Sequence, residues 1–450
     1  MELDLIRKYN VQGPRYTSYP AVPHWKNNIS ESQWVDRVST VFRASNKAHG
    51  ISVYIHLPYC ESLCTYCGCN TRITVNHAVE RPYILGVLAE WHAYIQLFGD
   101  ERPVIAELHL GGGTPTFFSP ENLQFLISEL LAPCDVAPQA EFGFEGHPNN
   151  TTFEHLRVLR NLGFTRLSLG IQDFDPVVQK AINRMQSVEQ VQTVVDEARA
   201  LGYESINFDI IFGLPFQQQS SIKTTLEATF RMKPDRIAFY GYAHVPWKHA
   251  GQRRYTDNDL PKGPEKRALY ELGKAMLEDQ GYSELGMDHF ALPHDSLFIA
   301  ANSGRMHRNF MGYTTQSTQL LIGLGCSAIS DSGDAYIQNK KVVEDYLESV
   351  QGGAFPFFTG HLLSQEECGM RQMVKDIMCH FHGNTTTVGW SAADARERLS
   401  EFIQDGILTL QDTEISVTET GRPFVRNICM AMDPHLQSAA EAANRFSTVV

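Results

Sequence analysis

The sequence has no long apolar run, no excess of basic residues and no low-complexity tract, and each absence excludes a class of protein. A membrane-spanning helix needs about 20 consecutive apolar residues, and the 450 residues contain no such stretch. Lys and Arg number 38 against 51 Asp and Glu, and the formal net charge of −13 argues against a nucleic-acid partner. Residues 1–8 lack the pattern of a signal peptide. We therefore expect a cytoplasmic protein without a membrane span.

Cysteine is also scarce, and it is unevenly placed. There are nine cysteines, and Cys60, Cys64, Cys67 and Cys69 crowd into one short segment while the others are scattered. A disulfide framework would use an even number of spaced cysteines in a secreted chain. The distribution therefore favours a reducing compartment and a metal site.

The central part of the chain alternates between two patterns. Hydrophobic residues make up 43% and charged residues 20%, which indicates a folded globular protein. Short β-rich runs bounded by Gly or Pro are followed by amphipathic segments, a pattern that predicts parallel strands joined by helices. The expected strands are residues 51–57, 104–110, 140–145, 166–171, 204–211 and 235–242. The expected helices are residues 82–98, 120–131, 153–162, 188–201 and 220–231.

The predicted fold class is α/β, with about six β/α units in a partial TIM-like barrel over residues 46–355. A complete eight-unit barrel typically needs about 250 residues, and the alternation fades after residue 242. Residues 1–45 are polar and irregular and are expected to form an arm over the active site. Residues 356–450 are expected to form a small, mainly helical or winged-helix unit, with helices at 366–382, 392–405 and 434–446 and a hairpin at 407–410 and 415–417.

The cysteine segment follows the first expected strand, at a carboxyl end, where parallel α/β folds gather their ligands. Its pattern is C-x3-C-x2-C-x-C. Three thiolates at this spacing can hold three irons of a cubane cluster and leave the fourth iron open. A zinc site usually has a second C-x2-C hook, and the ferredoxin run C-x2-C-x2-C does not match. An iron–sulfur site is therefore favoured, with a zinc knuckle or plain buried cysteines as the alternatives.

Polar residues and glycines follow the other expected strands. The glycines at 111–113 have no side chains to hold off a ligand, so their N–H groups can meet it directly. Glu145, Gln172 and Asp209 lie at later strand ends, and Arg184 is a nearby cation able to meet a carboxylate. Taken singly, each is more consistent with a structural role than with a functional one, but together they would line one rim.

The C-x3-C-x2-C pattern is the signature of the radical S-adenosylmethionine (radical SAM) superfamily, which the chain resembles here. The resemblance implies that Cys60, Cys64 and Cys67 ligate a [4Fe-4S] cluster. S-adenosylmethionine would chelate the open iron, and one electron from the reduced cluster would release a 5′-deoxyadenosyl radical. The glycine turn would receive the methionine end of S-adenosylmethionine.

Further segments extend the resemblance along nearly the whole chain, and there it is similar to the oxygen-independent coproporphyrinogen III oxidases. These segments are residues 8–10, 13–20, 111–115, 170–174, 287–291, 307–310, 312–316, 327–330 and 426–430, together with Cys69. The resemblance implies oxidative decarboxylation of two propionates of coproporphyrinogen III to vinyl groups, which yields protoporphyrinogen IX in haem biosynthesis. It also implies a second S-adenosylmethionine. We further expect an electron donor for the cluster and a monomeric chain.

The same resemblance assigns roles to single residues. Tyr54, Gly112 and Glu145 would hold the first S-adenosylmethionine. The second cofactor molecule, or the rest of the pocket, would be surrounded by Tyr66, Gly113, Thr114, Gln172, Arg184, Asp209, Ala243 and Ile329. Cys69 would be essential without being a ligand. The residues expected to be catalytic are Cys69, Glu145 and Arg184.

A substrate with four carboxylates requires a local positive region in a chain of net charge −13. The candidates are Arg15, Arg184, His289, His307 and Arg308. Candidates to pack on a tetrapyrrole face are Tyr16, Tyr19, Phe290, Phe310 and Tyr313, with core packing as the alternative for each. One residue departs from the family pattern, because His147 stands where the family usually has an acid. This change bears on the identity of the substrate.

Two other functions remain open. A paralogue with the same cofactors would methylate its substrate or open a haem ring anaerobically, but the segments at 287–291, 307–316 and 426–430 favour the oxidase. A haem-binding chaperone of the same fold would typically lack the last cysteine of the loop and the arm. Cys69 and residues 8–20 are both present.

Overall fold

A 12-stranded mixed sheet forms the centre of the computed structural model, which describes residues 3–436. Six neighbouring strands in its middle run parallel. They are β1 (Ile51–Leu57), β4 (Val104–Gly112), β5 (Asp135–Gly146), β6 (Arg166–Gln172), β7 (Ser205–Phe212) and β8 (Arg236–Gly241). The predicted α/β fold with a partial barrel is therefore confirmed. The strand order runs from β16 to β9 without closing, so the barrel is open.

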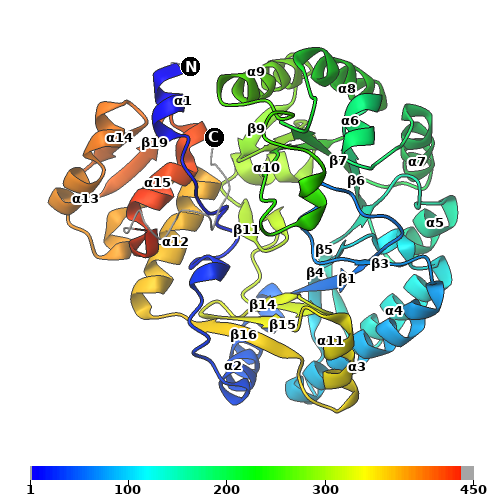
Figure 1. The fold of residues 1–450 in the computed structure, drawn as a ribbon. Helices are drawn as coiled ribbons and strands as arrows, with labels where there is room; N and C mark the ends of the chain where they lie inside the picture. The colour runs from blue at the N-terminus through cyan, green and yellow to red at the C-terminus, as the bar shows by residue number, and fades with distance from the viewer. Residues whose placement is uncertain (1–2, 437–450) are drawn as a thin grey trace.

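Helices connect the parallel strands and lie along the outside of the sheet (Figure 1). They are α3 (Glu80–Phe98), α4 (Pro120–Leu131), α5 (Phe153–Asn161), α6 (Pro176–Ala181), α7 (Val188–Ala200) and α8 (Gln219–Met232). The side chains of Ser119, Thr152 and Ser187 each accept a hydrogen bond from a backbone N–H of the first turn. Such caps satisfy N–H groups that have no partner inside the helix, and they start the helices close to their predicted positions.

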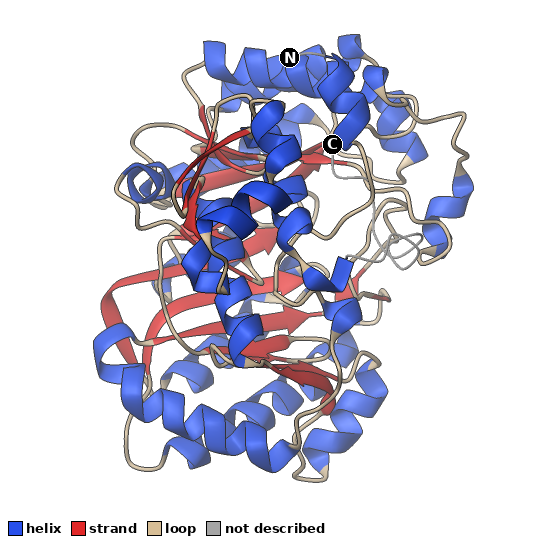
Figure 2. Ribbon diagram, turned by 90° about the vertical axis from the view of Figure 1, so that its left-hand side faces the viewer, coloured by secondary structure: helices blue, strands red, loops and turns tan. Residues whose placement is uncertain are grey.

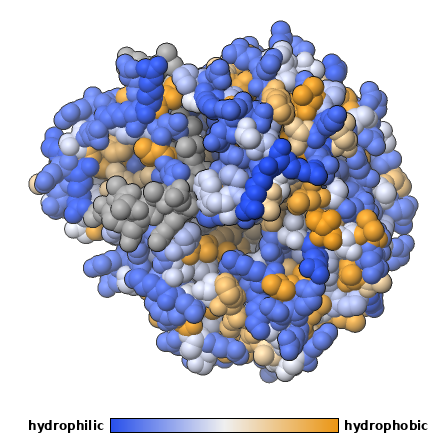
Figure 3. All heavy atoms as spheres, in the orientation of Figure 1, coloured by the Kyte–Doolittle hydropathy of each residue, from blue (hydrophilic) through white to orange (hydrophobic). Residues whose placement is uncertain are grey.

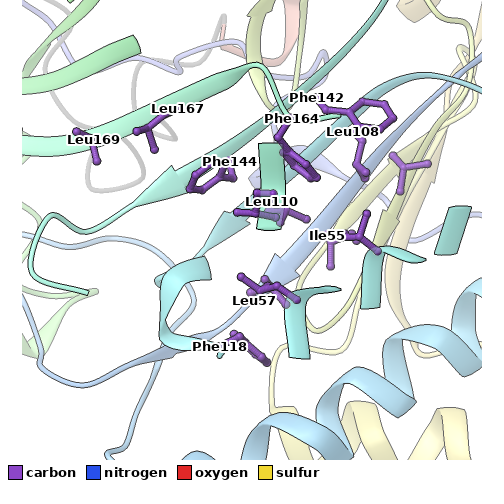
Figure 4. Packing of buried hydrophobic residues seen from close by; sticks show 14 of the residues in the cluster. Ile55, Leu57, Leu108, Leu110, Phe118, Phe142, Phe144, Phe164, Leu167 and Leu169 are labelled. Carbon is purple, nitrogen blue, oxygen red and sulfur yellow. The ribbon is translucent and has the colours of Figure 1, made fainter. Parts of the chain in front are cut away.

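The core lies between the sheet and these helices. Leu57, Leu110 and Phe118 pack together, and Phe144 and Phe164 continue the same cluster, as Figure 4 shows. β1 is buried along nearly its whole length, as expected for a parallel strand covered on both faces. Truncating one such leucine to alanine typically costs about 2–5 kcal/mol of stability.

The sheet extends beyond the predicted strands at both edges, where the added strands are mostly antiparallel. β13 (Leu321–Leu324) pairs parallel to β1 and is followed by β14 (Ile329–Asp331), β15 (Ala335–Asn339) and β16 (Phe357–Leu362). The other edge carries β10 (His289–Ala291) and β9 (Ser283–Gly286). The boundary expected at 355–356 falls before β16, whose residues pair with β15 in the large sheet. The remaining elements of this part are α9 (Pro264–Asp279), α10 (Ser296–Asn302), α11 (Val343–Gln351), and the pairs β2 (Tyr59–Cys60) with β3 (Arg72–Ile73) and β11 (His307–Asn309) with β12 (Gly312–Thr314).

The expectation of an irregular segment up to residue 45 is wrong for its second half. After α1 (Leu3–Tyr9) and an extended stretch, residues 31–49 form α2 (Glu31–His49). Trp34, Val38 and Phe42 follow one another at helical spacing and are buried in the barrel's core. These three side chains bind α2 to the sheet, so the arm proper ends near Ser30, which caps the helix.

The C-terminal unit has a three-stranded sheet and short helices, in keeping with a small winged-helix unit. Its elements are α12 (Gln365–His380), β17 (His382–Asn384), α13 (Ala392–Arg398), α14 (Ser400–Gln404), β18 (Leu408–Gln411), β19 (Glu414–Val417) and α15 (Val425–Met432). The hairpin is confirmed, while the helix expected at 392–405 is two helices that meet at Leu399. Of the helix expected at 434–446, a single turn (Pro434–Leu436) is present, and the rest lies outside the described residues.

The arm packs against the C-terminal unit. Ile6, Tyr9 and Tyr19 belong to the same hydrophobic cluster as the core of α12 and α15. The ring of Tyr9 stacks on Phe402 with centroids 5.1 Å apart. Figure 1 shows α1 beside α14 and α15, and Figure 2 shows the strands in the middle of the molecule with helices outside them. The two ends of the chain thus meet in one small core.

Hydrophilic side chains prevail on the face of the molecule seen in Figure 3. Among residues 3–436, none of the helices has the length and apolar character needed to cross a bilayer.

Candidate active site

A cavity of about 670 Å³ lies at the carboxyl ends of the parallel strands. Its wall contains all but three of the residues predicted as ligands, cofactor contacts or catalytic groups: Cys60, Cys64, Tyr66, Cys67, Cys69, Gly112, Gly113, Thr114, Glu145, Gln172, Arg184 and Asp209. The exceptions are Tyr54, Ala243 and Ile329. Residues from five strand ends and the cysteine loop are thus brought to one place.

The cysteine loop is pinned at both ends. Tyr59 and Cys60 in β2 pair with Arg72 and Ile73 in β3, and the N–H of Thr65 donates to the carbonyl of Ile182 at 2.9 Å. Within residues 3–436, no three His, Cys, Asp or Glu side chains are grouped closely enough to hold a single metal ion. Thiols spread along a cavity wall suit a polynuclear cluster better than a zinc ion, whose ligands converge on one point.

The thiols of the loop have different surroundings. The backbone N–H of Cys69 donates to the sulfur of Cys67 at 3.4 Å. Interaction with Cys69 lowers the pKa of Cys67 to about 7, and interaction with Cys67 raises the pKa of Cys69 well above its ordinary value. The Cys60 sulfur lies 3.3 Å from the hydroxyl oxygen of Thr114. Burial raises the pKa of Cys60 to about 11. Cys69 is therefore in contact with a predicted ligand, and its exclusion from the ligand set stays a prediction.

The glycine turn after β4 allows two backbones to approach closely. Gly112 has a φ of 111°, and a Cβ there would lie 2.7 Å from the ring of His56. A Cβ on Gly113 would lie 2.6 Å from the carbonyl of Pro58. Any side chain at either position would push the turn away from the cysteine loop. Glycine is therefore required for the N–H groups of this turn to face the cavity.

Glu145 ends β5 with a side chain that is 46% exposed and faces the cavity. Tyr54 lies beside Glu145, since a Cβ on Gly111 would contact both the carboxylate of Glu145 at 3.0 Å and the ring of Tyr54 at 3.1 Å. Tyr54 itself does not line the cavity. The Tyr54 hydroxyl is 3.1 Å from Nδ1 of His56. Tyr54 is thus placed to support the carboxylate that does face the cavity.

Arg184 is buried in the cavity wall. One terminal nitrogen donates to the carbonyl of Gly170 at 2.6 Å, and the other lies 3.6 Å from the sulfur of Cys64. Its Nε is buried and has no hydrogen-bond partner among the described residues. Next to it, Gln172 has a φ of 65°, a conformation that costs a residue other than glycine about 1–3 kcal/mol. Both features fit a wall shaped for a polar ligand.

Asp209 is the second carboxylate of the wall. It accepts hydrogen bonds from Nδ2 of Asn207 at 2.9 Å and from the hydroxyl of Ser168 at 3.3 Å. Burial, and then the charge of Glu145, raise the pKa of Asp209 to about 7. Near neutral pH this side chain is therefore divided between a form that donates a hydrogen bond and a form that only accepts.

Ala243 and Ile329 lie apart from the cavity. The carbonyl of Ala243 accepts from Nε2 of Gln252 at 3.3 Å, and the same nitrogen donates to the carbonyl of Tyr66 at 3.1 Å. Ala243 therefore sits behind Tyr66. Ile329 begins β14 and is half-buried. The roles predicted for these two residues stay predictions.

A second cavity of about 120 Å³ lies inside the barrel and shares Glu145, Ser168, Asp209 and Tyr240 with the first. Ser168 and Tyr240 were missed by the sequence analysis. A sequence signal existed for both residues. Ser168 lies two residues before Gly170, and Tyr240 lies two residues before Tyr242, the neighbour of Ala243. Alternate residues of a strand share a face. Towards the amino ends of the strands, Thr314 donates to Glu107 at 2.6 Å.

The candidate cations fall into two groups. Burial lowers the pKa of His289 and of His307 to about 4, so both are neutral at physiological pH. The expectation that they add positive charge is therefore wrong. One terminal nitrogen of Arg15 lies 3.6 Å from a carboxylate oxygen of Asp288.

The candidate aromatic residues serve mainly as packing. Tyr16 and Tyr19 donate their hydroxyls to Asp433 at 3.0 and 3.2 Å. Phe290 is in the large core, and Phe310 packs edge-on against other rings. Of the five candidates, Tyr313 lines the inner cavity. The alternative of core packing thus describes most of this set.

His147 lies on the wall of the larger cavity. Its Nδ1 accepts from the N–H of Asn149 at 3.1 Å. Burial and the nearby charge of Arg184 lower the pKa of His147 to about 3, so the ring is neutral and carries its proton on Nε2. Where an acid would present an acceptor, this ring presents a donor.

Comparisons with known proteins agree with this geometry. Residues 54–229 match the Radical SAM superfamily. The oxygen-independent coproporphyrinogen III oxidase of Pseudomonas aeruginosa is 38% identical, over 100% of this chain and 98% of its own length. The enzyme of that name from Escherichia coli K12 is 35% identical over the same shares. A solved structure of coproporphyrinogen III oxidase (HemN) from Escherichia coli, described as a radical SAM enzyme, has a TM-score of 0.89 and 34% identity and covers 97% of this chain and 99% of that one.

Proposed function

Since the chain belongs to the family of the oxygen-independent coproporphyrinogen III oxidases, we propose that it converts coproporphyrinogen III to protoporphyrinogen IX by oxidative decarboxylation of two propionates to vinyl groups. The observation that carries this proposal is the single cavity at the strand ends. Three spaced thiols, a glycine turn, a carboxylate and a buried guanidinium meet on its wall.

The residues present fit a [4Fe-4S] cluster and S-adenosylmethionine. Cys60, Cys64 and Cys67 offer three sulfur donors on one loop. In the same wall, the Nε of Arg184 has no hydrogen-bond acceptor among the described residues and can donate to a ligand. Bound there, these groups would supply one-electron chemistry that ends in the abstraction of a hydrogen atom from the substrate.

We propose that Glu145 and the N–H groups around Gly112 hold the amino and carboxylate ends of the first S-adenosylmethionine, with Tyr54 supporting Glu145. A carboxylate suits an ammonium group, and backbone N–H groups suit a carboxylate. The second molecule would be held by Tyr66, Gly113, Thr114, Gln172, Arg184 and Asp209, with Ala243 and Ile329 further out. Cys69 would act on the substrate side of the cluster.

We further propose that the protein works in the cytoplasm as a monomer and receives electrons from a separate donor. A loop of closely spaced thiols requires a reducing compartment. One chain supplies the whole wall of the cavity, which supports a monomer. Cys69 and Leu63 are exposed beside the ligands, so a donor can approach the loop from solvent.

Product analysis by mass spectrometry tests the reaction. The protein, with its cluster reconstituted, is incubated anaerobically with coproporphyrinogen III, a reductant and S-adenosylmethionine, and the Cys64→Ala variant serves as the matched control. We expect two successive losses of CO2 and two hydrogens, with formation of 5′-deoxyadenosine. A methylated or ring-opened product would support the paralogue, and stoichiometric haem binding without 5′-deoxyadenosine would support the chaperone.

A further inference from the structure

Four cationic side chains gather where the arm, the barrel and the C-terminal unit meet. Arg15 comes from the arm, Lys266 from α9, Arg308 from β11 and Arg426 from α15. We name these four residues the cation wall. Asp288, in the turn between β9 and β10, is the carboxylate that Arg15 approaches, and its φ of 64° holds it in the left-handed region.

Several contacts show that the four cations are close together. Arg308 donates to the carbonyl of Arg15 at 3.4 Å, and Arg15 approaches Asp288. Lys266, Asp288 and Arg426 line one small cavity of about 60 Å³. The mutual repulsion of Arg15, Lys266 and Arg426 lowers the pKa of both Lys266 and Arg426, after the larger effect of burial.

The cation wall holds more positive charge than its carboxylate neutralises. Arg308 is only 6% exposed. The nearby carboxylates are engaged elsewhere, because Asp433 accepts from two tyrosines and Glu284 from Lys274 and Tyr270. Buried charge that is not paired is costly. An anion bound here would remove that cost.

Arg308 carries the most specific sign of such an anion. Its Nε and one terminal nitrogen are buried and, within residues 3–436, have no hydrogen-bond partner. The guanidinium lies 4.6 Å from the ring centroid of Tyr313, which fixes its plane. The two unused donors, Nε and Nη1, point in different directions within this plane, so each can donate separately to an oxygen of an anion.

The cation wall also lies next to the substrate space. Tyr240 lines both cavities, and the guanidinium of Arg15 is 5.8 Å from the centroid of its ring. Tyr313, below Arg308, lines the inner cavity. Tyr240 and Tyr313 thus each contact one of the cations and line a cavity.

We propose that the cation wall binds the carboxylates that the reaction leaves in place, and so turns the reacting propionates towards the cysteine loop. This inference rests on the proposed function, in which two of the four propionates react and two persist. Arg308 takes one carboxylate through its unused N–H groups, and Arg15 and Lys266 attract the other. The arm and the C-terminal unit therefore act as positioning elements for the macrocycle.

Equilibrium binding separates this role from a merely structural one. The probes are coproporphyrin III, the oxidised form that is stable in air, and its tetramethyl ester, and the readout is porphyrin fluorescence. We expect wild type to bind the acid at least about tenfold more tightly than the ester. Arg308→Gln should lose most of that preference, because it weakens binding of the acid and leaves binding of the ester unchanged. Arg308→Lys should restore part of the preference, because the positive charge remains while the guanidinium is lost.

Arg305→Gln is the matched control, since Arg305 is exposed near the start of the same hairpin and bonds to Ser303. Lys266→Gln, at a half-buried site, is the second variant if Arg308→Gln does not fold. An unchanged preference for the acid in a folded variant, or an equal loss for acid and ester, would overturn the inference.

Turnover by the same preparations separates this inference from the proposed function. Arg308→Gln should raise KM for coproporphyrinogen III about tenfold, whereas Arg305→Gln should keep the KM of wild type. If wild type forms the vinyl product but binds the acid and the ester equally, the inference about the cation wall is wrong and the proposed function stands. Absence of product from a wild type that cleaves S-adenosylmethionine would count against the proposed function.

Discussion

Cys67 and Cys69 lie two residues apart on the cysteine loop, and the hydrogen bond between them joins a predicted ligand to a predicted non-ligand. Serine keeps a hydrogen-bonding group at position 69 but cannot replace a thiol in radical chemistry. We expect Cys69→Ser to retain its iron and lose decarboxylation, whereas Cys64→Ala loses both the iron and the cleavage of S-adenosylmethionine.

Iron content, absorbance and product formation measure this difference. Cys368→Ala, at a half-buried thiol on α12 away from the cavity, is the control that should behave as wild type. Loss of iron from Cys69→Ser would move Cys69 into the ligand set.

Asp209 connects the cavity to the stability of the fold. Its pKa is raised from 3.8 to about 7, so its protonated form stabilises the fold fully below pH 4, and this stabilisation is lost as the pH rises through 7. Asparagine resembles the protonated acid. We expect Asp209→Asn to match wild type near pH 4 and to be more stable by about 1–3 kcal/mol at pH 8.

Urea unfolding of the cofactor-free protein at several pH values measures this effect. Asp196→Asn, on an exposed face of α7, serves as the control. A stability difference that does not change with pH would contradict the prediction. The variant should also bind S-adenosylmethionine more weakly, because a carboxylate of the cavity wall has been neutralised.

At the scale of elements, the contact between the arm and the C-terminal unit converges on Asp433. This buried carboxylate accepts the hydroxyls of Tyr16 and Tyr19, while Asn427 and Arg426 donate to carbonyls of the arm. The arm between residues 9 and 19 is thus hydrogen-bonded to α15 and to the turn after it. The arm is also held by the barrel, because Arg15 donates to the carbonyl of Gly241 at 3.1 Å and the Tyr336 hydroxyl donates to the carbonyl of Tyr19 at 3.3 Å.

Asp433→Ala removes the shared acceptor and leaves two buried hydroxyls unpaired, at a cost of about 2–4 kcal/mol. We expect faster hydrogen exchange and earlier proteolytic cleavage within residues 10–30, with the barrel's protection unchanged. Glu419→Ala, at a side chain that is 82% exposed, is the control. Uniform loss of protection over the whole chain would show that the contact supports the entire fold.

At the scale of the whole molecule, an acidic chain gathers four of its cations in one place. The net charge is −13, yet the cation wall draws residues from four distant segments around Asp288. Local potential, rather than net charge, then decides whether a substrate with several carboxylates is attracted. The same crowding makes one member of the wall sensitive to pH.

Lys266 faces Arg15 of the arm, Asp288 of the barrel and Arg422 and Arg426 of the C-terminal unit. Burial, followed by the charge of Arg15, lowers the pKa of Lys266 to about 8, so its positive charge is present below pH 8 and lost above it. We expect KM for the substrate to rise as the pH increases through this range, by up to about tenfold.

Initial rates at saturating S-adenosylmethionine between about pH 7 and pH 9 measure this dependence. Lys266→Gln should have a raised KM that varies less with pH, and Lys262→Gln, at an exposed lysine of the same region, should follow wild type. An equal rise of KM in Lys266→Gln would assign the titration to another group.

The elements that the sequence predicts well are those whose signals are local. β1 has its predicted bounds, and α4 begins at Pro120 directly after its Ser119 cap. The second half of the arm was missed, because the apolar stripe of Trp34, Val38 and Phe42 was outweighed by the polar residues between them. The strands at the sheet edges were missed as well, since runs as short as Ser283–Gly286 carry too little periodicity.

By itself, the sequence determined the α/β alternation, the cysteine loop and the glycine turn, because spacing along the chain sets which backbone forms and which donors share a loop. Only the tertiary structure decided that His289 and His307 are neutral, that Tyr54 stands behind Glu145, and that Arg15, Lys266 and Arg426 share one wall. Burial and electrostatic interaction depend on distances between segments hundreds of residues apart, and no local pattern records those distances.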